Sequence, residues 1–337
     1  MDGPRRPGGL AAGGGFGERV RHRTLAVALP RIEGGIAGPA GIRAGPAMRG
    51  VLGGEACGVL ITTYGLTTVG AAGPRDPGAE PPMPNGYSTP MEMLARKLDS
   101  ISRLADSDRA ALLDLPHTVR NLPARHDIVR FGDRPTHSCL VLQGWVYRYA
   151  ALAEGGRQIL SFYIAGDLPD LQSLHLHRMD HNLATLTSCV VALIAHDDLR
   201  AVLLSNPGLA GTLWRDSLID AAHYRERITS LGRRQALGRV AHLFCELYLR
   251  QKAVGLARGL SCPLVPKQSE LADALGLTSV HLNRVLRTLR GRGLVTLSGG
   301  LLTIEDWDAL AEVAEFDQTF LHLANNSIPA REAAEAV

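Results

Sequence analysis

The sequence lacks the features that mark membrane-spanning, metal-cluster and secreted proteins. No apolar run reaches the 18 residues of a transmembrane helix, and the best candidate, residues 58–69, carries four threonines and two glycines. Arg5 and Arg6 are followed by glycines instead of an apolar segment, so we expect no secretory signal. The five cysteines never occur in a CxxC spacing, which excludes the usual zinc and iron–sulfur signatures and is typical of a reducing cytoplasm.

Catalytic motifs are missing as well. The chain has no P-loop, no GxSxG and no arrangement that suggests a nucleophile with its base, so we predict that it is not an enzyme. Its 337 residues leave room for two ordinary domains and more, at about 150 residues per domain. Hydrophobic residues make up 45% and charged residues 20%, a composition that allows a buried core.

Charge is distributed unevenly along the chain. Residues 1–90 carry nine arginines and six acidic residues, and residues 91–230 carry fifteen basic and sixteen acidic ones. Residues 231–297 hold eleven basic against three acidic residues, a net charge of +8, whereas residues 298–337 have a net charge of −7. The basic block indicates a surface that binds a polyanion. A helical module with solvated arginines on its outer face is the alternative.

The first 90 residues differ in composition from the rest. They contain 21 of the 37 glycines and 11 of the 19 prolines, and their apolar residues show no sustained period. Such a segment cannot bury enough surface to offset the entropy of ordering, so we predict disorder. Met91 and Met93 stand directly before the first periodic segment, and two interpretations stay open: a flexible extension, or a start codon assigned too far upstream.

From residue 91 onward the pattern predicts ordered structure. Apolar residues at helical spacing predict a helix over 93–104 and a second over 107–115. Residues 116–205 lose this period, and their β-branched and aromatic residues predict short strands. The expected strands are 128–131, 138–143, 145–150, 158–164, 183–187 and 190–194. Strands at this spacing, without long intervening helices, favour an antiparallel barrel or jelly roll.

A long helix is expected after Asn206, extending to about residue 230. Its apolar stripe consists of Leu209, Leu213, Trp214, Leu218, Ala221 and Ile228. Such a stripe favours packing against a second copy of the same helix. Simple coverage of the β-domain is the alternative.

The most specific pattern lies inside the basic block. A helix begins near Pro266 and ends at Gly276, where glycine permits the positive φ of a tight turn. Thr278 provides an N-cap for a second helix over 279–290. The segment 294–304, with a Ser-Gly-Gly turn at its centre, has the pattern of a hairpin. Together these features predict a winged helix-turn-helix.

A helical wheel identifies the outward side chains of the second helix. With the leucine face inward, the opposite face carries Val280, Arg284 and Arg287. Valine suits a thymine methyl group, and an arginine can bind guanine O6 and N7 with two donors. Arg287, Arg290 and Arg292 are expected to contact phosphates. The predicted DNA-binding residues are Ser279, Val280, His281, Asn283, Arg284, Arg287 and Arg290.

A strand-rich domain, a long helix and a winged helix-turn-helix reading QSELADALGLTSVHLNRVLRTLRGRGLV together resemble the Crp/Fnr family of bacterial transcription regulators. The resemblance implies an α+β fold, with an N-terminal β-roll similar to a cyclic-nucleotide-binding jelly roll. It places the family's base-reading positions at Ser279, Val280, Asn283 and Arg284. Arg284 matches the family's arginine, whereas Val280 stands where many members carry a glutamate. The VHxNR core resembles an alphaproteobacterial branch of the family.

The resemblance also implies a division into domains. A disordered extension over 1–90 precedes a β-roll sensor domain with its N-terminal helices over 91–205. A dimerisation helix over 206–230 leads into a winged helix-turn-helix DNA-binding domain over 231–322. A flexible tail over 323–337 ends the chain.

Cyclic-nucleotide-binding members of the family carry a cassette that opens with Gly-Glu-Leu and contains an Arg-Ser pair. This chain has Gly166, Asp167 and Leu168 at the opening and, by the resemblance, Met179 and Asp180 at the pair. An aspartate there would repel the cyclic phosphate, so we expect no cyclic nucleotide to bind. These five residues form the predicted effector pocket, and the small-molecule effector itself stays unknown.

Several reactive side chains have an ordinary interpretation beside a functional one. His175, His177 and His181 have a spacing that suits a metal and faintly resembles cupin enzymes, but no carboxylate follows at the usual distance. Cys139 and Cys189 fall in expected strands, where cysteine is more often a small core residue than a redox sensor. We therefore predict no cofactor and no metal site. An oxygen-sensing iron–sulfur cluster is not expected either, because the N-terminal cysteine cluster it needs is missing.

The resulting prediction is a cytoplasmic transcription regulator that binds double-stranded DNA as a homodimer on a pseudo-palindromic operator, with no membrane partner. Its β-roll is the sensor domain, and RNA polymerase is the further partner expected. Two alternatives stay open: a metal-dependent cupin-type β-barrel enzyme with a basic helical tail, and a cyclic-nucleotide-binding signalling protein.

Overall fold

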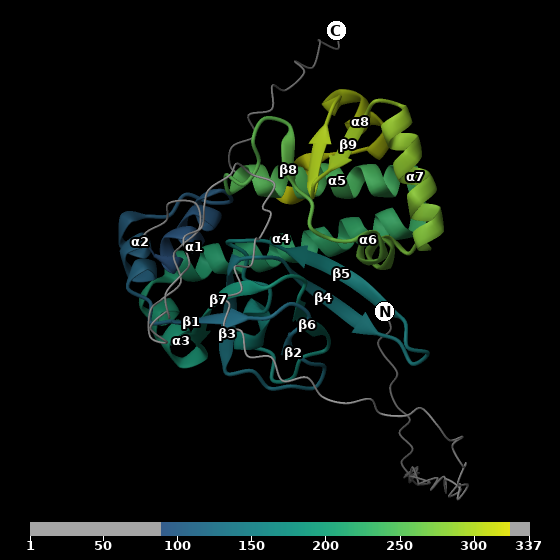
Figure 1. The fold of residues 1–337 in the computed structure, drawn as a ribbon. Helices are drawn as coiled ribbons and strands as arrows, with labels where there is room; N and C mark the ends of the chain where they lie inside the picture. Colours follow the sequence, from purple (N-terminus) through teal and green to yellow (C-terminus); the bar gives the residue numbers. More distant parts are fainter. Residues whose placement is uncertain (1–88, 324–337) are drawn as a thin grey trace, which may run out of the picture. The chain divides into compact units, whose positions relative to one another are not determined.

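The computed structural model describes residues 89–323. The predicted N-terminal extension and C-terminal tail fall almost entirely outside the described residues. Two short helices lead into a β-roll, a long helix and a C-terminal helical domain with a small sheet (Figure 1). The predicted α+β architecture is confirmed.

The elements have the following bounds. The helices are α1 (Pro90–Asp99), α2 (Asp106–Leu113), α3 (His196–Ser205), α4 (Pro207–Arg233), α5 (Ala236–Ala253), α6 (Gln268–Leu275), α7 (Ser279–Gly291) and α8 (Trp307–Ala314), with 3-10 turns η2 (Leu171–Leu174) and η3 (Gln318–Leu321). The strands are β1 (Thr118–Leu122), β2 (Asp127–Val129), β3 (His137–Gln143), β4 (Val146–Ala151), β5 (Arg157–Tyr163), β6 (Asn182–Thr185), β7 (Cys189–Ala195), β8 (Ser261–Pro263), β9 (Val295–Ser298) and β10 (Leu301–Ile304).

The β-roll consists of two antiparallel sheets. One has the strand order β1-β7-β3 and the other the order β2-β6-β4-β5. Their buried residues, among them Cys139, Val141, Leu183 and Val191, form the core of the roll. The predicted jelly roll is confirmed, and each expected strand is present with shifts of one or two residues. Strand β1 was missed because its residues are largely exposed and carry little apolar pattern.

Two predicted helical boundaries were wrong. Residues 116–205 were expected to form strands only, but their last ten residues form α3, which buries His196 and Leu199. Helix α1 ends at Asp99 instead of residue 104, since the Asp99 carboxylate accepts a hydrogen bond from the Leu104 N–H at 3.0 Å and closes a turn. At its start, Thr89 and Glu92 form a capping box.

Helix α4 is longer than predicted and has 27 residues. Its apolar residues divide between two faces. Leu209 and Leu213 are buried beside the β-roll, whereas the side chains of Trp214 and Ile228 are 65% and 70% exposed. Coverage of the β-domain therefore explains one face of the helix, and the second face is left open to a partner.

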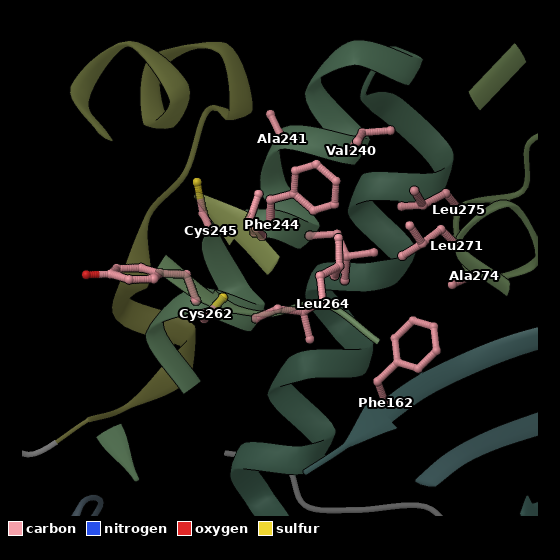
Figure 2. Packing of buried hydrophobic residues seen from close by; sticks show 14 of the residues in the cluster. Phe162, Val240, Ala241, Phe244, Cys245, Cys262, Leu264, Leu271, Ala274 and Leu275 are labelled. Atoms are coloured by element: carbon pink, nitrogen blue, oxygen red, sulfur yellow. The ribbon is translucent and has the colours of Figure 1, made fainter. Parts of the chain in front are cut away.

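The C-terminal domain is built around α5, twelve consecutive residues of which are buried. Helices α6, α7 and α8 pack on α5, and β8, β10 and β9 form a three-stranded antiparallel sheet beside it. Figure 2 shows part of this core: Phe244 of α5 lies among the apolar side chains of the domain, and Leu271 and Leu275 extend from α6.

The β-roll contacts the C-terminal domain directly. Phe162 of β5 belongs to the same buried cluster as Leu271 of α6, and both are seen in Figure 2. At the edge of this contact, Arg157 Nε lies 2.7 Å from an Asp273 carboxylate oxygen. The first helix of the helix-turn-helix is thus held against a strand of the roll.

Candidate nucleic-acid interface

The turn between α6 and α7 has the geometry predicted from the sequence. Gly276 ends α6 in the left-handed conformation, with φ at 61°, and its N–H donates to the Ala272 carbonyl. Thr278 then caps α7, because its hydroxyl accepts a hydrogen bond from the His281 N–H at 3.2 Å. The predicted winged hairpin follows as β9 and β10, joined by two glycines with positive φ. A helix-turn-helix with a wing is therefore present.

Helix α7 has one buried and one exposed face. Leu282, Val285, Leu286 and Leu289 are buried against the domain core. Val280 is 65% exposed. The arginines of the helix point to solvent: Arg284, Arg287 and Arg290 are exposed, as is Arg292 directly after it.

No ion pair involves these four arginines within residues 89–323. Their charges face water and are available to an anionic partner, although Arg290 Nε also donates a hydrogen bond to the Leu286 carbonyl at 3.3 Å. Ser279 and His281 flank the same face and are also exposed.

Asn283 differs from its neighbours because its side chain is already engaged. It is half-buried, and its Nδ2 donates a hydrogen bond to Gln268 Oε1 of α6 at 3.1 Å. Sequence reasoning did not find Gln268, since the two residues are fifteen positions apart and a glutamine at a helix start carries no specific signal.

A second candidate site is a cavity of about 370 Å³ between the β-roll and α4. Leucines form much of its wall, among them Leu168 and Leu171. Three aspartates also line it, Asp180, Asp216 and Asp220, together with the guanidinium of Arg148. Its charged lining among the described residues is therefore mainly acidic.

Arg148 is not free to bind a ligand anion. It is buried, and its Nη1 lies 3.1 Å from Asp220 Oδ2. The same guanidinium donates to the Tyr224 hydroxyl and the Pro169 carbonyl. It also lies 5.2 Å from the centre of the Tyr163 ring. These partners occupy the arginine in the structure.

Two of the five residues of the predicted effector pocket line this cavity. Leu168 and Asp180 line the cavity, but Met179 is buried in the core of the β-roll. Gly166 has a φ of 97°, and a Cβ built there would lie 3.3 Å from Lys97. Asp167 does not line this cavity, but it lines a small neighbouring pocket together with Leu168, Asp216 and Asp220.

Asp167 belongs to a buried chain of charges that connects several elements. Its carboxylate lies 3.2 Å from Lys97 Nζ of α1 and 2.9 Å from Arg250 Nη2 of α5. Arg250 pairs in turn with Glu246, and Glu246 with Arg227 of α4. Burial opposes ionisation of Asp167, but Lys97 and Arg250 outweigh it and hold its pKa below the ordinary value. The cassette acid thus links the β-roll to the C-terminal domain.

The other reactive side chains of the roll have local partners. His181 Nδ1 lies 2.6 Å from Asp180, and His181 Nε2 lies 3.3 Å from Gln172. Within residues 89–323, no group of three or more histidine, cysteine or acidic side chains is placed to hold a metal ion. Cys139 and Cys189 are buried, and burial raises the pKa of both thiols.

Two family models match the chain, one over the β-roll and the other over the helix-turn-helix. The cyclic nucleotide-binding domain matches residues 119–206, which contain the β-roll. The Crp-like helix-turn-helix domain matches residues 238–313, which contain α6, α7 and the wing. None of the helices in residues 89–323 is both long and apolar enough to cross a bilayer.

The chain is similar to known regulators over the same region. It is 26% identical over 189 residues to the nitrogen fixation regulation protein FixK of Azorhizobium caulinodans, covering 56% of this chain and 75% of that protein. It is 25% identical over 190 residues to the fumarate and nitrate reduction regulatory protein of Escherichia coli, covering 56% and 74%. The solved structure of FixK2 from Bradyrhizobium japonicum superposes with a TM-score of 0.55 at 24% identity, covering 59% of this chain and 98% of that one. This last likeness supports the fold.

Proposed function

Since the chain belongs to the Crp/Fnr family of transcription regulators, we propose that it binds a pseudo-palindromic DNA operator as a homodimer, with α7 of each copy in the major groove. The family consists of regulators and not of enzymes. RNA polymerase is the further partner that a regulator of this kind would contact at a promoter.

The outward face of α7 carries the proposal. A helix that buries four apolar residues and exposes Val280, Arg284 and Arg287 has a side chain pattern suited to a groove. Arg284 would read guanine through its two donors, and Val280 would contact a thymine methyl group. Arg287 and Arg290 would contact phosphates and fix the position of the helix. Ser279 and His281 stand beside these contacts.

The exposed face of α4 supports the homodimer. Trp214, Leu218 and Ile228 follow this face, and each is about half exposed or more. A second α4 packed against it would cover these side chains. Two recognition helices would then meet half-sites about 34 Å apart on one face of the duplex.

The acidic cavity supports a regulator that does not bind cyclic nucleotide. Asp220 already pairs with Arg148, and Asp216 lies 3.6 Å from Lys97 Nζ. Asp180 is left to oppose a cyclic phosphate, and the single arginine of the wall already has its partners. Instead of holding a ribose, Asp167 connects the β-roll to α5. Operator binding is therefore proposed not to depend on cyclic nucleotide.

A selection from random duplexes tests the proposal. The purified full-length chain, without ligand and at moderate salt, is expected to enrich a two-fold symmetric site. Arg284→Ala is expected to weaken binding to that site by about tenfold or more. Arg130→Ala is the matched control, because this exposed arginine pairs with Asp127 on the β-roll, outside the C-terminal domain. Failure to enrich any symmetric site, with or without cyclic nucleotide, would contradict the proposal.

The oligomeric state is tested separately by sedimentation. The wild-type chain is expected to sediment as a dimer at micromolar concentration, and Trp214→Asp to shift it toward the monomer because a charge would be buried in the apolar contact. An unchanged dimer in this variant would show that α4 does not form the interface.

A further inference from the structure

The hydrogen bond between α6 and α7 bears on which base the recognition helix prefers. We infer that Gln268 is a positioning residue for operator recognition: it orients the carboxamide of Asn283 so that this side chain selects adenine. The inference rests on the proposed function. It adds that Asn283 reads adenine at one operator position and that Gln268 sets this preference.

The geometry leaves Asn283 one free acceptor and one free donor. Its Nδ2 gives one of two N–H groups to Gln268 Oε1 at 3.1 Å. The described residues provide no partner for its Oδ1, and the second N–H is likewise not used. An acceptor beside a donor is the pattern that pairs with adenine, whose N6 donates and whose N7 accepts.

The position of the two residues fits this role. Asn283 lies one residue before Arg284, in the N-terminal half of α7, where the helix of such a motif approaches base edges. Gln268 is the first residue of α6, and it is exposed and in hydrogen-bond contact with Asn283. The bond therefore couples the two helices at the surface that would face DNA. Without it, the amide of Asn283 would rotate, and its donor and acceptor would be equally available to other bases.

Substitutions at residue 268 separate orientation from charge. Gln268→Glu keeps an acceptor and can hold Asn283 as the structure shows, although its negative charge would weaken binding to every duplex. Gln268→Lys can only donate, so it would turn the Asn283 amide the other way while its positive charge strengthens binding overall. Gln268→Met has a similar length and makes no hydrogen bond.

The measurement is the ratio of affinities for adenine and for the other three bases at one operator position, obtained by fluorescence anisotropy. The operator position that Asn283 reads is identified with Asn283→Ala: it is the position at which this variant loses the base preference of the wild-type chain. We expect the wild-type chain to favour adenine there by about tenfold. Gln268→Glu is expected to keep this ratio with lower overall affinity. Gln268→Lys and Gln268→Met are expected to reduce it to about twofold or less.

The control is Lys267→Met, which removes a charge from the neighbouring exposed residue and leaves the Asn283 contact in place. It should lower affinity for all duplexes and leave the ratio unchanged. The double variant Gln268→Met with Asn283→Ala should behave as Asn283→Ala alone, because both changes act through one side chain.

Three results would overturn the inference. They are an unchanged ratio in Gln268→Met, a lost ratio in Gln268→Glu, or a set of base preferences that Asn283→Ala does not alter. Each presupposes that the wild-type chain selects a symmetric operator. If it selects none, the proposed function itself fails, so the two failures are distinct.

Discussion

Helix α7 and the cavity between the β-roll and α4 differ in how their charged residues are placed. On α7, the arginines are exposed and no ion pair engages them within the described residues. Around the cavity, Arg148 and Asp220 are already paired, and the nearby Asp167 is buried between two cations. Charges that face water without a partner are suited to an external anion. Charges that are buried and paired hold the parts of the protein together.

This contrast explains why the two halves of the family pattern differ here. The helix-turn-helix exposes the arginines of α7 to solvent, where an anionic partner can reach them. The cassette keeps its glycine and its acid, but the acid connects α1, the β-roll and α5 through Lys97 and Arg250. An acidic residue at a family ligand-binding position, here Asp167, can therefore stabilise the fold instead of binding a ligand.

The largest effect is expected from breaking the buried chain of charges. Arg250→Met removes one of the two cationic partners of Asp167 and one of the two of Glu246, and both acids are buried. Loss of one member of such a network typically costs about 3–5 kcal/mol. Urea unfolding at pH 7 should show a loss of that order. The matched change Arg130→Met, at an exposed pair, should cost no more than about 0.5 kcal/mol, and equal losses in both variants would contradict the distinction.

A smaller and pH-dependent effect is expected at Asp170. This buried carboxyl accepts a hydrogen bond from the Cys139 N–H at 2.7 Å, and burial raises its pKa to about 7. Between about pH 4 and pH 7 the folded chain holds a proton that the unfolded chain has lost, so this group's contribution to stability falls as pH rises. Asp170→Asn keeps the acceptor and never ionises.

The stability of Asp170→Asn relative to wild type should therefore increase from pH 4 to pH 7, by an amount on the order of a few kcal/mol, and then level off. Urea titrations at half-unit pH intervals would measure it. A constant difference across this range would show that Asp170 titrates at its ordinary pKa.

The smallest effect is expected from cyclic nucleotide. Cyclic AMP or cyclic GMP at millimolar concentration should leave the thermal midpoint of the wild-type chain unchanged within about 1 °C, because the acidic wall of the cavity disfavours the phosphate. A rise of several degrees that saturates with concentration would mean that the chain binds these ligands despite the acidic lining of the cavity.

Much of the fold could be predicted because its signals are local. Thr278 as an N-cap, Gly276 at positive φ and the spacing of Leu282 and Val285 each act over a few residues, and all stand as expected. The end of α1 and the presence of α3 could not be predicted as well. The end of α1 involves a single carboxylate, that of Asp99, which closes a turn. Helix α3 is short and directly follows strand β7, so its helical spacing is hard to separate from the strand pattern before it.

The contacts that define the sites are less visible in the sequence. Arg250 lies 83 positions from Asp167, and no spacing rule connects them. The same holds for Arg157 and Asp273, which meet only because β5 packs on α6. Periodicity indicates which face of a helix is buried, as for α7, but it does not identify the partner of a buried charge.

The central claim is that α7 reads DNA through Arg284 while arginines farther along the helix contact phosphates. The direct measurement is the ratio of affinities for the selected operator and a scrambled duplex, compared for wild type, Arg284→Ala and Arg290→Ala. Arg284→Ala should lose most of the ratio. Arg290→Ala should weaken both duplexes about equally and reduce the slope of log affinity against log salt by about one. If both variants lower the ratio alike, or neither does, α7 does not read sequence in the way described.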